Sequence, residues 1–306
     1  MAATADDASR AVTALTDAAW ALAAVVEVIE RGPQPSYAAD DLPARVLAQV
    51  GLVIETDGGL VPTPGFADFV AQSGPIRAAA ARSVMGQVAS LLAGGNLAEG
   101  WTRQDDETLK AQGAASAGGI DFILAGLFAQ LPGLEERLRA EGAAFLDVGA
   151  GVGAMACAWA EAIPTLTIVG VDPFERVHRM ASELATARGL GDRVTFRLCG
   201  VEDLGDVDAF DLAWIPAPFV PPGPFRAGLA TLHRAIRPDG WIVVGMGRLE
   251  GEDLSSAVTR WQTALIGGTP LTPAEAASLL TAAGFADPRT LATPPGAPVL
   301  VAARRP

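Results

Sequence analysis

A short glycine-rich run in the second half of the chain has the residue types best suited to chemistry. Residues 145–148 read as a buried strand, Gly149, Gly151 and Gly153 follow it, and a helix begins near Ala154. Glycine lets the backbone turn tightly and approach a ligand, and the start of a helix presents free amide hydrogens. The run therefore predicts a cofactor-binding turn rather than a turn that only joins strand to helix.

Two acidic residues frame this turn. Asp147 stands two residues before the first glycine, and Asp172 ends the next predicted strand, where it can accept hydrogen bonds from both hydroxyls of a ribose. The spacing of Gly149, Gly151 and Ala154 also satisfies the loose dinucleotide fingerprint. A nicotinamide cofactor therefore stays open, although Asp147, Gly153 and the long stretch ahead of the turn argue against it.

The elements around the turn alternate between strand and helix. Buried strands are predicted at residues 145–148, 167–171, 194–198, 210–215 and 241–245, with helices such as 174–188 and 225–236 between them. This alternation is typical of an α/β fold, in which helices cover both faces of a parallel sheet. Residues 290–292 and 299–303 read as a closing hairpin, so the last strand is expected to run antiparallel to the others.

The front of the chain has a different pattern. A helix over residues 8–30, a short helix ending at Gly51, a hairpin around Asp57 and Gly58, and a helix after Thr63 give the order of a winged helix. Residues 1–75 hold three bases and ten acids, a net charge of 3 − 10 = −7. Because phosphates repel such a surface, we expect a packing or dimerisation role and not DNA recognition.

Composition narrows the class of protein further. The 306 residues carry a formal charge of 22 − 35 = −13, and half of them are apolar, which predicts folded domains and excludes nucleic-acid partners and anionic membranes. Cys157 and Cys199 form neither a disulfide framework nor a metal-ligand set. Asp6 and Asp7 stand where a secretory signal would be basic, so we expect a soluble cytoplasmic protein without a membrane span.

The run from Asp147 to Gly153, Asp-Val-Gly-Ala-Gly-Val-Gly, resembles the first motif of the class I S-adenosylmethionine (SAM)-dependent methyltransferases. The front of the chain is similar to the winged-helix dimerisation domain of small-molecule O-methyltransferases. The resemblance implies a Rossmann-like, doubly wound sheet of seven strands with an antiparallel last strand, and a homodimer. It divides the chain into a winged-helix-like dimerisation domain (1–95), a helical linker and acceptor-site cap (96–140) and a SAM-binding domain (141–306).

The resemblance also implies cofactor contacts. The three glycines would bed the methionine end of SAM, with Asp147 beneath them and Asp172 on the ribose. Gly200 stands where the family has an acid that contacts adenine, so Glu202 or the backbone of Val201 is expected to supply that contact. The implied cofactor-binding residues are Asp147, Gly149, Ala150, Gly151, Gly153, Asp172, Pro173, Phe174, Gly200, Val201, Glu202 and Trp214.

The segment after the fourth strand, residues 214–222, carries no general base where plant-type O-methyltransferases have a histidine. No catalytic residue or metal ligand is therefore assigned. Methyl transfer would depend on positioning and on exclusion of water. We expect an aromatic pocket formed by Trp214 and Phe219 from the sheet and Trp101 and Phe122 from the cap. It would take a small aromatic or apolar metabolite, methylated on oxygen, nitrogen or carbon.

Three alternatives to a methyltransferase remain at this point. The same SAM-binding fold can host decarboxylation, hydroxylation or pericyclic chemistry, and the missing base favours that option. An NAD-dependent oxidoreductase is the second, although the sequence has no hydride-site pattern. The third is a ligand-sensing regulator without enzymatic activity, which the acidic winged helix does not support.

Overall fold

The computed structural model describes residues 4–32, 34–94, 97–294 and 297–306. Two compact units, Met1–Met85 and Gly86–Pro306, make up the chain. The division falls inside a long helix, earlier than the boundary expected after residue 95, which itself lies beside residues outside the described ranges. Residues 97–140, expected as a separate linker and cap, belong to the second unit.

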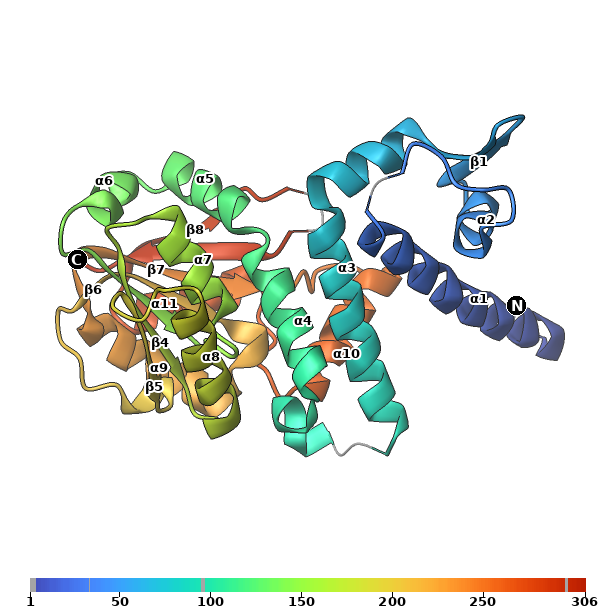
Figure 1. Cartoon of the computed structure of the whole chain (residues 1–306). Helices are drawn as coiled ribbons and strands as arrows, with labels where there is room; N and C mark the ends of the chain where they lie inside the picture. The colour runs from blue at the N-terminus through green and yellow to red at the C-terminus, as the bar shows by residue number, and fades with distance from the viewer. Residues whose placement is uncertain (1–3, 33, 95–96, 295–296) are drawn as a thin grey trace. The chain divides into compact units, whose positions relative to one another are not determined.

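The first unit has the predicted order of elements (Figure 1). Helix α1 (Ala5–Glu30) begins with a capping box between Thr4 and Asp7, and α2 (Leu42–Gln49) is capped by Asp41. Strands β1 (Val53–Thr56) and β2 (Gly59–Pro62) form the hairpin, and α3 (Pro64–Leu92) starts after it. Apolar side chains from all of these elements share one core, including Val28, Leu47, Val53, Leu60 and Phe66. The winged-helix arrangement of elements is thus present.

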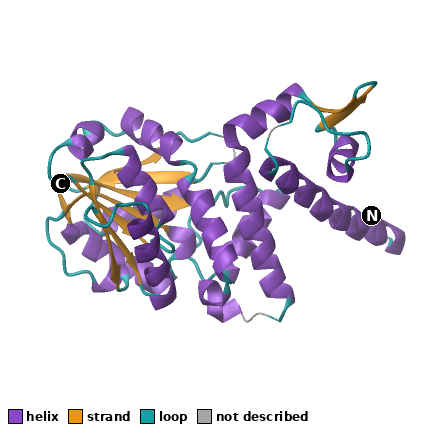
Figure 2. Cartoon of the chain, viewed as in Figure 1, coloured by secondary structure: helices purple, strands orange, loops and turns teal. Residues whose placement is uncertain are grey.

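The second unit is built on one sheet of seven strands (Figure 2). In chain order these are β3 (Ala144–Val148), β4 (Thr167–Asp172), β5 (Val194–Leu198), β6 (Phe210–Pro216), β7 (Ile236–Met246), β8 (Ala286–Leu291) and β9 (Val299–Arg304). Their spatial order is β5-β4-β3-β6-β7-β9-β8, and β9 pairs antiparallel with both of its neighbours. The expected mixed sheet with an antiparallel last strand is confirmed.

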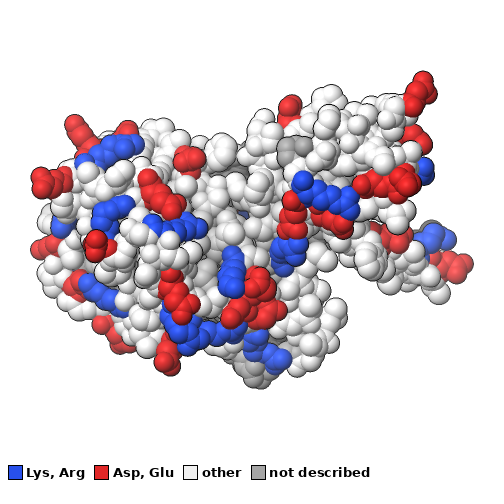
Figure 3. Space-filling model, viewed as in Figure 1, with Lys and Arg blue, Asp and Glu red and all other residues white. Residues whose placement is uncertain are grey.

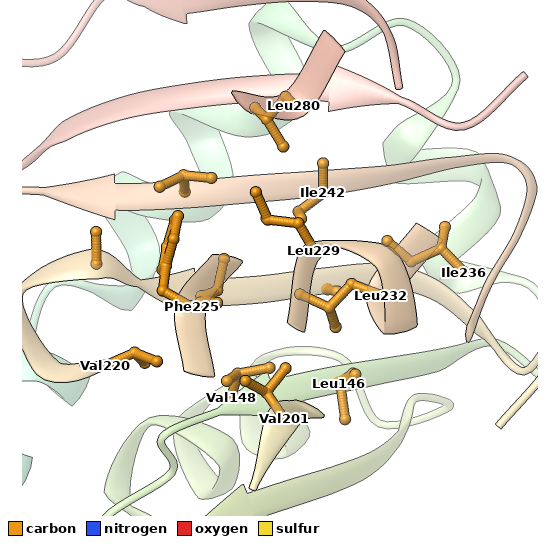
Figure 4. Packing of buried hydrophobic residues seen from close by; sticks show 14 of the residues in the cluster. Leu146, Val148, Val201, Val220, Phe225, Leu229, Leu232, Ile236, Ile242 and Leu280 are labelled. Atoms are coloured by element: carbon orange, nitrogen blue, oxygen red, sulfur yellow. The ribbon is translucent and has the colours of Figure 1, made fainter. Parts of the chain in front are cut away.

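Helices cover both faces of this sheet. The unit contains η1 (Leu97–Arg103), α4 (Asp106–Ala117), α5 (Ile120–Gln130), α6 (Leu134–Arg139), α7 (Ala154–Ala162), α8 (Glu175–Ala187), η2 (Val201–Asp203), η3 (Ala217–Phe219), α9 (Pro222–Ala235), α10 (Leu254–Leu265) and α11 (Pro273–Ala282). One buried core joins the sheet to α9 and α11, as Figure 4 shows for Phe225, Leu229 and Leu280. The other joins it to α5, α6 and α7. The central strands are therefore buried on both sides, whereas β5 and β8, at the two edges of the sheet, are partly exposed.

Candidate functional site

The glycine turn lies at the carboxyl end of β3, between the ends of β4 and β6. The amides of Gly149 and Ala150 donate to the carbonyl of Val171 on β4, at 2.8 and 3.1 Å. Gly149, Gly151 and Gly153 have φ angles of 66°, 52° and 77°, a left-handed conformation that favours glycine. Each glycine of the motif therefore has a backbone reason to be there.

The last two glycines differ in what surrounds them. A Cβ on Gly153 would lie 2.6 Å from Phe196 and 2.9 Å from Ala181, so this position must be small for packing. A Cβ on Gly151 would meet nothing nearer than a backbone oxygen at 4.0 Å, so the space beside Gly151 is open. Gly151 is therefore the position where the turn leaves room for a ligand.

Asp172 is fixed at the end of β4 beside this open space. Its carboxylate accepts one hydrogen bond from the amide of Gly151 and one from the amide of Phe174, both at 3.0 Å. Burial raises the pKa of Asp172, and the two amide hydrogen bonds oppose that rise. Each carboxylate oxygen keeps a further lone pair, so Asp172 can still accept from the hydroxyl groups of a ligand.

Asp147 lies in β3 beneath the turn and is only 2% exposed. Burial, together with the charge of Asp172, raises the pKa of Asp147 to about 7. Among the described residues, its Oδ2 atom has no hydrogen-bond partner. A cationic ligand bound above this carboxyl would favour its ionised form and so lower its pKa.

The turn after β5 explains the glycine found at position 200. The carboxyl of Glu202 folds back so that a Cβ on Gly200 would lie 2.5 Å from Glu202 Oε2. Val201 is held beneath α9, where the hydroxyl of Thr231 donates to its carbonyl at 2.6 Å. The carboxyl of Glu202 therefore lies beside position 200, where the family that the sequence resembles has an acid.

The end of β6 leads to an aromatic contact. Phe219 in η3 and Trp101 in η1 pack edge to face, with ring centroids 5.3 Å apart, so the structure brings these two predicted pocket residues together. Trp214 is 5% exposed, and its ring covers Gly245 of the neighbouring β7 strand, which is a packing role. Phe122 is 65% exposed on α5, so it is not brought to the pair. Phe174 is also exposed, at 41%, beside exposed Pro173.

A segment from the far end of the chain holds η3 in place. The amide of Thr269 donates to the carbonyl of Ala217 at 2.8 Å, and its hydroxyl donates to the carbonyl of Val220 at 2.7 Å. The carbonyl of Pro218 lies so close to Gly268 that any side chain there would collide with it. The loop that carries Phe219 is therefore bound to residues 268–269.

Buried polar atoms without partners gather around the turn. Within the described residues five such side-chain atoms occur; Asp147 and Glu202 belong to β3 and to the turn after β5, and Trp101 and Gln104 belong to the segment just before α4. Only Trp159 is deep in the core. Because an unpaired buried polar group is costly, this distribution fits a site whose ligand supplies the missing partners.

The two histidines each contact a backbone carbonyl, and Cys199 is a thiol of raised pKa. His178 Nε2 lies 3.2 Å from the carbonyl of Phe196, and His233 Nε2 lies 3.2 Å from the carbonyl of Gly284. Burial raises the pKa of the Cys199 thiol. In the part of the chain that the structure describes, no group of three or more His, Cys, Asp or Glu side chains could hold a metal ion.

A cluster at the opposite edge of the sheet is structural. Asp211, at the start of β6, is 4% exposed and pairs with both Arg137 and Arg237, and its Oδ2 accepts from the amide of Ala144 at 2.9 Å. An open depression of about 300 Å³ lies over these residues. Since its charges already satisfy one another, this cluster ties α6 to the sheet and is not a second active site.

Comparison with known proteins agrees with this geometry. Residues 145–240 match the model of a methyltransferase domain. No curated protein sequence matches the chain significantly.

Three solved structures are similar over nearly the whole chain. A candidate O-methyltransferase of Nostoc punctiforme PCC 73102 is 19% identical, with a TM-score of 0.66 and coverage of 99% of this chain and 100% of that one. The mitomycin 7-O-methyltransferase MmcR is 21% identical, with a TM-score of 0.61 and 98% of both chains covered. Human N-acetylserotonin methyltransferase, solved with SAM, is 16% identical, with a TM-score of 0.59 and coverage of 100% and 99%. The chain therefore carries a methyltransferase domain and has the fold of the class I SAM-dependent methyltransferases.

Proposed function

We propose that this protein transfers the methyl group of SAM to a small molecule. The observation that carries the proposal is the hydrogen bond between the amide of Gly151 and the carboxylate of Asp172. It holds the open side of the glycine turn next to a carboxylate that can accept further hydrogen bonds. The unpartnered oxygens of Asp147 and Glu202 fit a cationic ligand that carries amino groups. The methyltransferase model over residues 145–240 favours methyl transfer over decarboxylation, hydroxylation or pericyclic chemistry.

The residues divide the work along the carboxyl edge of the sheet. Gly149, Gly151 and Gly153 would bed the methionine end, Asp172 would bind the ribose, and Glu202 would accept from the adenine amino group. Pro173, Phe174 and the backbone of Val201 would border the adenine, and Ala150 completes the turn. Bound SAM supplies a methyl group on a positively charged sulfur. The chain's own contribution is to orient donor and acceptor and to exclude water.

The pair formed by Trp101 and Phe219 is the proposed wall of the acceptor pocket. Two aromatic rings in edge-to-face contact offer an apolar, rigid surface, which suits a flat aromatic or apolar metabolite. MmcR and N-acetylserotonin methyltransferase are, by their names, enzymes of small molecules. We propose that this protein also acts on a small-molecule acceptor. A panel of aromatic compounds assayed for S-adenosylhomocysteine release would identify which one it methylates.

The cofactor can be tested without an acceptor. Mass spectrometry of the denatured protein should detect SAM or S-adenosylhomocysteine, and calorimetry should show binding of SAM but not of NAD. Asp172→Ala should weaken SAM binding strongly because the ribose loses its acceptor. Binding of NAD in place of SAM, or unchanged SAM affinity in Asp172→Ala, would refute the proposal.

We also propose a homodimer formed through the first unit. The apolar stripe of α1 is buried at Val26 and Ile29, whereas towards the N-terminus its residues Val12 and Leu15 are each 64% exposed. A stripe that continues past its own core suits a second copy of the same helix. Light scattering should give twice the chain mass, and Leu15→Asp should halve it, whereas Ala14→Asp, which points away from the stripe on the same helix, should not.

A soluble cytoplasmic location completes the proposal, with no nucleic-acid partner. Figure 3 shows basic side chains interspersed with acidic ones and no continuous basic face on the side in view. By length and apolar content alone, Ala5–Glu30 and Asp106–Gln130 would pass as membrane spans. The second comprises α4 and α5, of 12 and 11 residues, and each is shorter than the ~20 residues needed to cross a bilayer.

A further inference from the structure

The segment from Trp101 to Gln104 crosses the carboxyl edge of the sheet above the glycine turn. In the sheet, β3 lies between β4 and β6. Trp101 contacts Phe219, which follows β6, and the carbonyl of Gln104 accepts from Arg176 at 2.7 Å, in the helix that follows β4. The segment is therefore attached on both sides of the turn that follows β3. All of these residues belong to the second unit.

Helix α4 holds this segment firmly in place. Its N-cap, Asp105, accepts from the amide of Thr108 at 2.7 Å. One turn on, Leu109 packs against Val152 in the glycine turn and against Val177 of α8. Further along, Gly113 lies so close to Val152 that a side chain there would collide with it. The residues before α4 are thus positioned by packing, and Gln104 cannot move freely away from the glycine turn.

Gln104 is 7% exposed, yet its side-chain oxygen has no hydrogen-bond partner among the described residues. An amide oxygen only accepts hydrogen bonds, so the missing partner must be a donor. Leaving such an oxygen buried and unpaired costs folding free energy. The hydrogen bonds that fix the segment come from the Gln104 backbone and from Asp105, and within the described residues none of them uses the side-chain oxygen of Gln104.

We infer that Gln104 Oε1 accepts a hydrogen bond from the ammonium group of the methyl donor, an inference that rests on the proposed function. In the proposed function Asp172, at the end of β4, would bind the ribose hydroxyls. The methionine end of the donor would lie over the glycine turn, beneath the segment that carries Gln104. An ammonium offers three donors, and a neutral amide oxygen binds it without adding another charge beside Asp147 and Asp172.

Calorimetry with two nucleosides tests this assignment. S-adenosylhomocysteine carries the ammonium, whereas methylthioadenosine keeps the ribose and adenine but lacks the aminoacyl end. We expect Gln104→Leu to weaken S-adenosylhomocysteine binding about tenfold or more and to leave methylthioadenosine binding unchanged. Gln104→Glu, which keeps an acceptor oxygen, should retain the affinity for S-adenosylhomocysteine.

Two further measurements separate a binding role from a structural one. Gln104→Leu should unfold at the wild-type temperature or higher, because it removes a buried amide oxygen that has no hydrogen-bond partner among the described residues. Gln130→Leu is the matched control. The Gln130 side chain is bonded to the backbone of Ala292, so this variant should lose stability but not affinity.

Several results would overturn the inference. Unchanged S-adenosylhomocysteine affinity in Gln104→Leu would exclude a contact with the donor. An equal loss of affinity for both nucleosides would assign Gln104 to the ribose or adenine and refute the ammonium contact. Failure of the wild-type protein to bind S-adenosylhomocysteine would instead refute the proposed function.

Discussion

The open side of Gly151 gives a direct test of where the ligand lies. Gly151→Ala places a methyl group in the space beside Asp172, where nothing else comes within 4.0 Å except one backbone oxygen at that distance. Gly189, after α8, provides a matched control. Its φ is 68°, close to the 52° of Gly151, and a Cβ there would meet nothing within 4 Å. Both substitutions therefore impose the same kind of backbone strain without a collision.

The two variants should lose similar stability. A non-glycine residue in the left-handed region costs about 1–2 kcal/mol. For a domain of this size, each kcal/mol lowers the midpoint of thermal unfolding by roughly 2–4 °C. Only Gly151→Ala should also lose ligand affinity, because its methyl group occupies the surface that the ligand approaches. Overpacking a close contact costs about 1–3 kcal/mol, which corresponds to a loss of roughly 5–150-fold in affinity.

Differential scanning calorimetry and titration with S-adenosylhomocysteine measure both effects on the same samples. The expected result is equal destabilisation of the two variants, with weakened binding in Gly151→Ala alone. If Gly151→Ala binds as tightly as Gly189→Ala, then no ligand approaches the glycine turn at this point. The assignment of the turn would then be wrong, whatever the fold resembles.

Three other predictions follow from the same structure. The pKa of Asp147 is about 7 in the folded chain and about 3.9 when unfolded, so its proton stabilises the fold at low pH and this contribution is lost as the pH rises through about 7. Asp147→Asn should therefore gain stability relative to wild type between about pH 5 and pH 8. A stability difference that does not change with pH would contradict this. Asp211→Ala leaves Arg137 and Arg237 without their shared partner and should lower the free energy of unfolding by about 3 kcal/mol while S-adenosylhomocysteine affinity stays unchanged; an unchanged denaturation midpoint would show that the pairs contribute nothing. Wild-type protein should bind S-adenosylhomocysteine more tightly than S-inosylhomocysteine, the deaminated form of that nucleoside. Glu202→Ala should reduce the ratio between the two affinities. If wild type and Glu202→Ala give the same ratio, Glu202 does not contact the adenine.

Much of the sheet could be predicted because its central strands are buried on both faces. Residues 145–148, 167–171 and 210–215 are mostly apolar, residues 194–198 alternate apolar with polar side chains, and each segment is a strand. β7 begins earlier than predicted, at Ile236, because Pro238, Asp239 and Gly240 read as a turn. In the structure Asp239 has a φ of 63° and its amide donates to the carbonyl of Arg305 at 2.9 Å, a distant contact that local patterns do not reveal.

The site was only partly predictable from residue type. The backbone geometry at Gly149, Gly151 and Gly153 follows from the motif, since only glycine adopts it readily. Side-chain direction does not follow from type, which is why Trp101 and Phe219 meet while Phe122 points to solvent. Gln104 gave no signal, because a glutamine before a helix cap is ordinary and its position depends on distant residues such as Arg176 of α8.

If Phe219 lines the acceptor pocket, as proposed above, the attachment of η3 to residues 268–269 limits how acceptor preference can change. Phe219 stands on a loop whose backbone is bonded to Thr269 and presses against Gly268. If only the loop after β6 were replaced by the loop of a relative, the new loop would not fit residues 268–269, which lie about fifty positions further along the chain. Chimeras designed to accept new metabolites should therefore carry both segments from the same parent, and evolution of the pocket would be expected to alter them together.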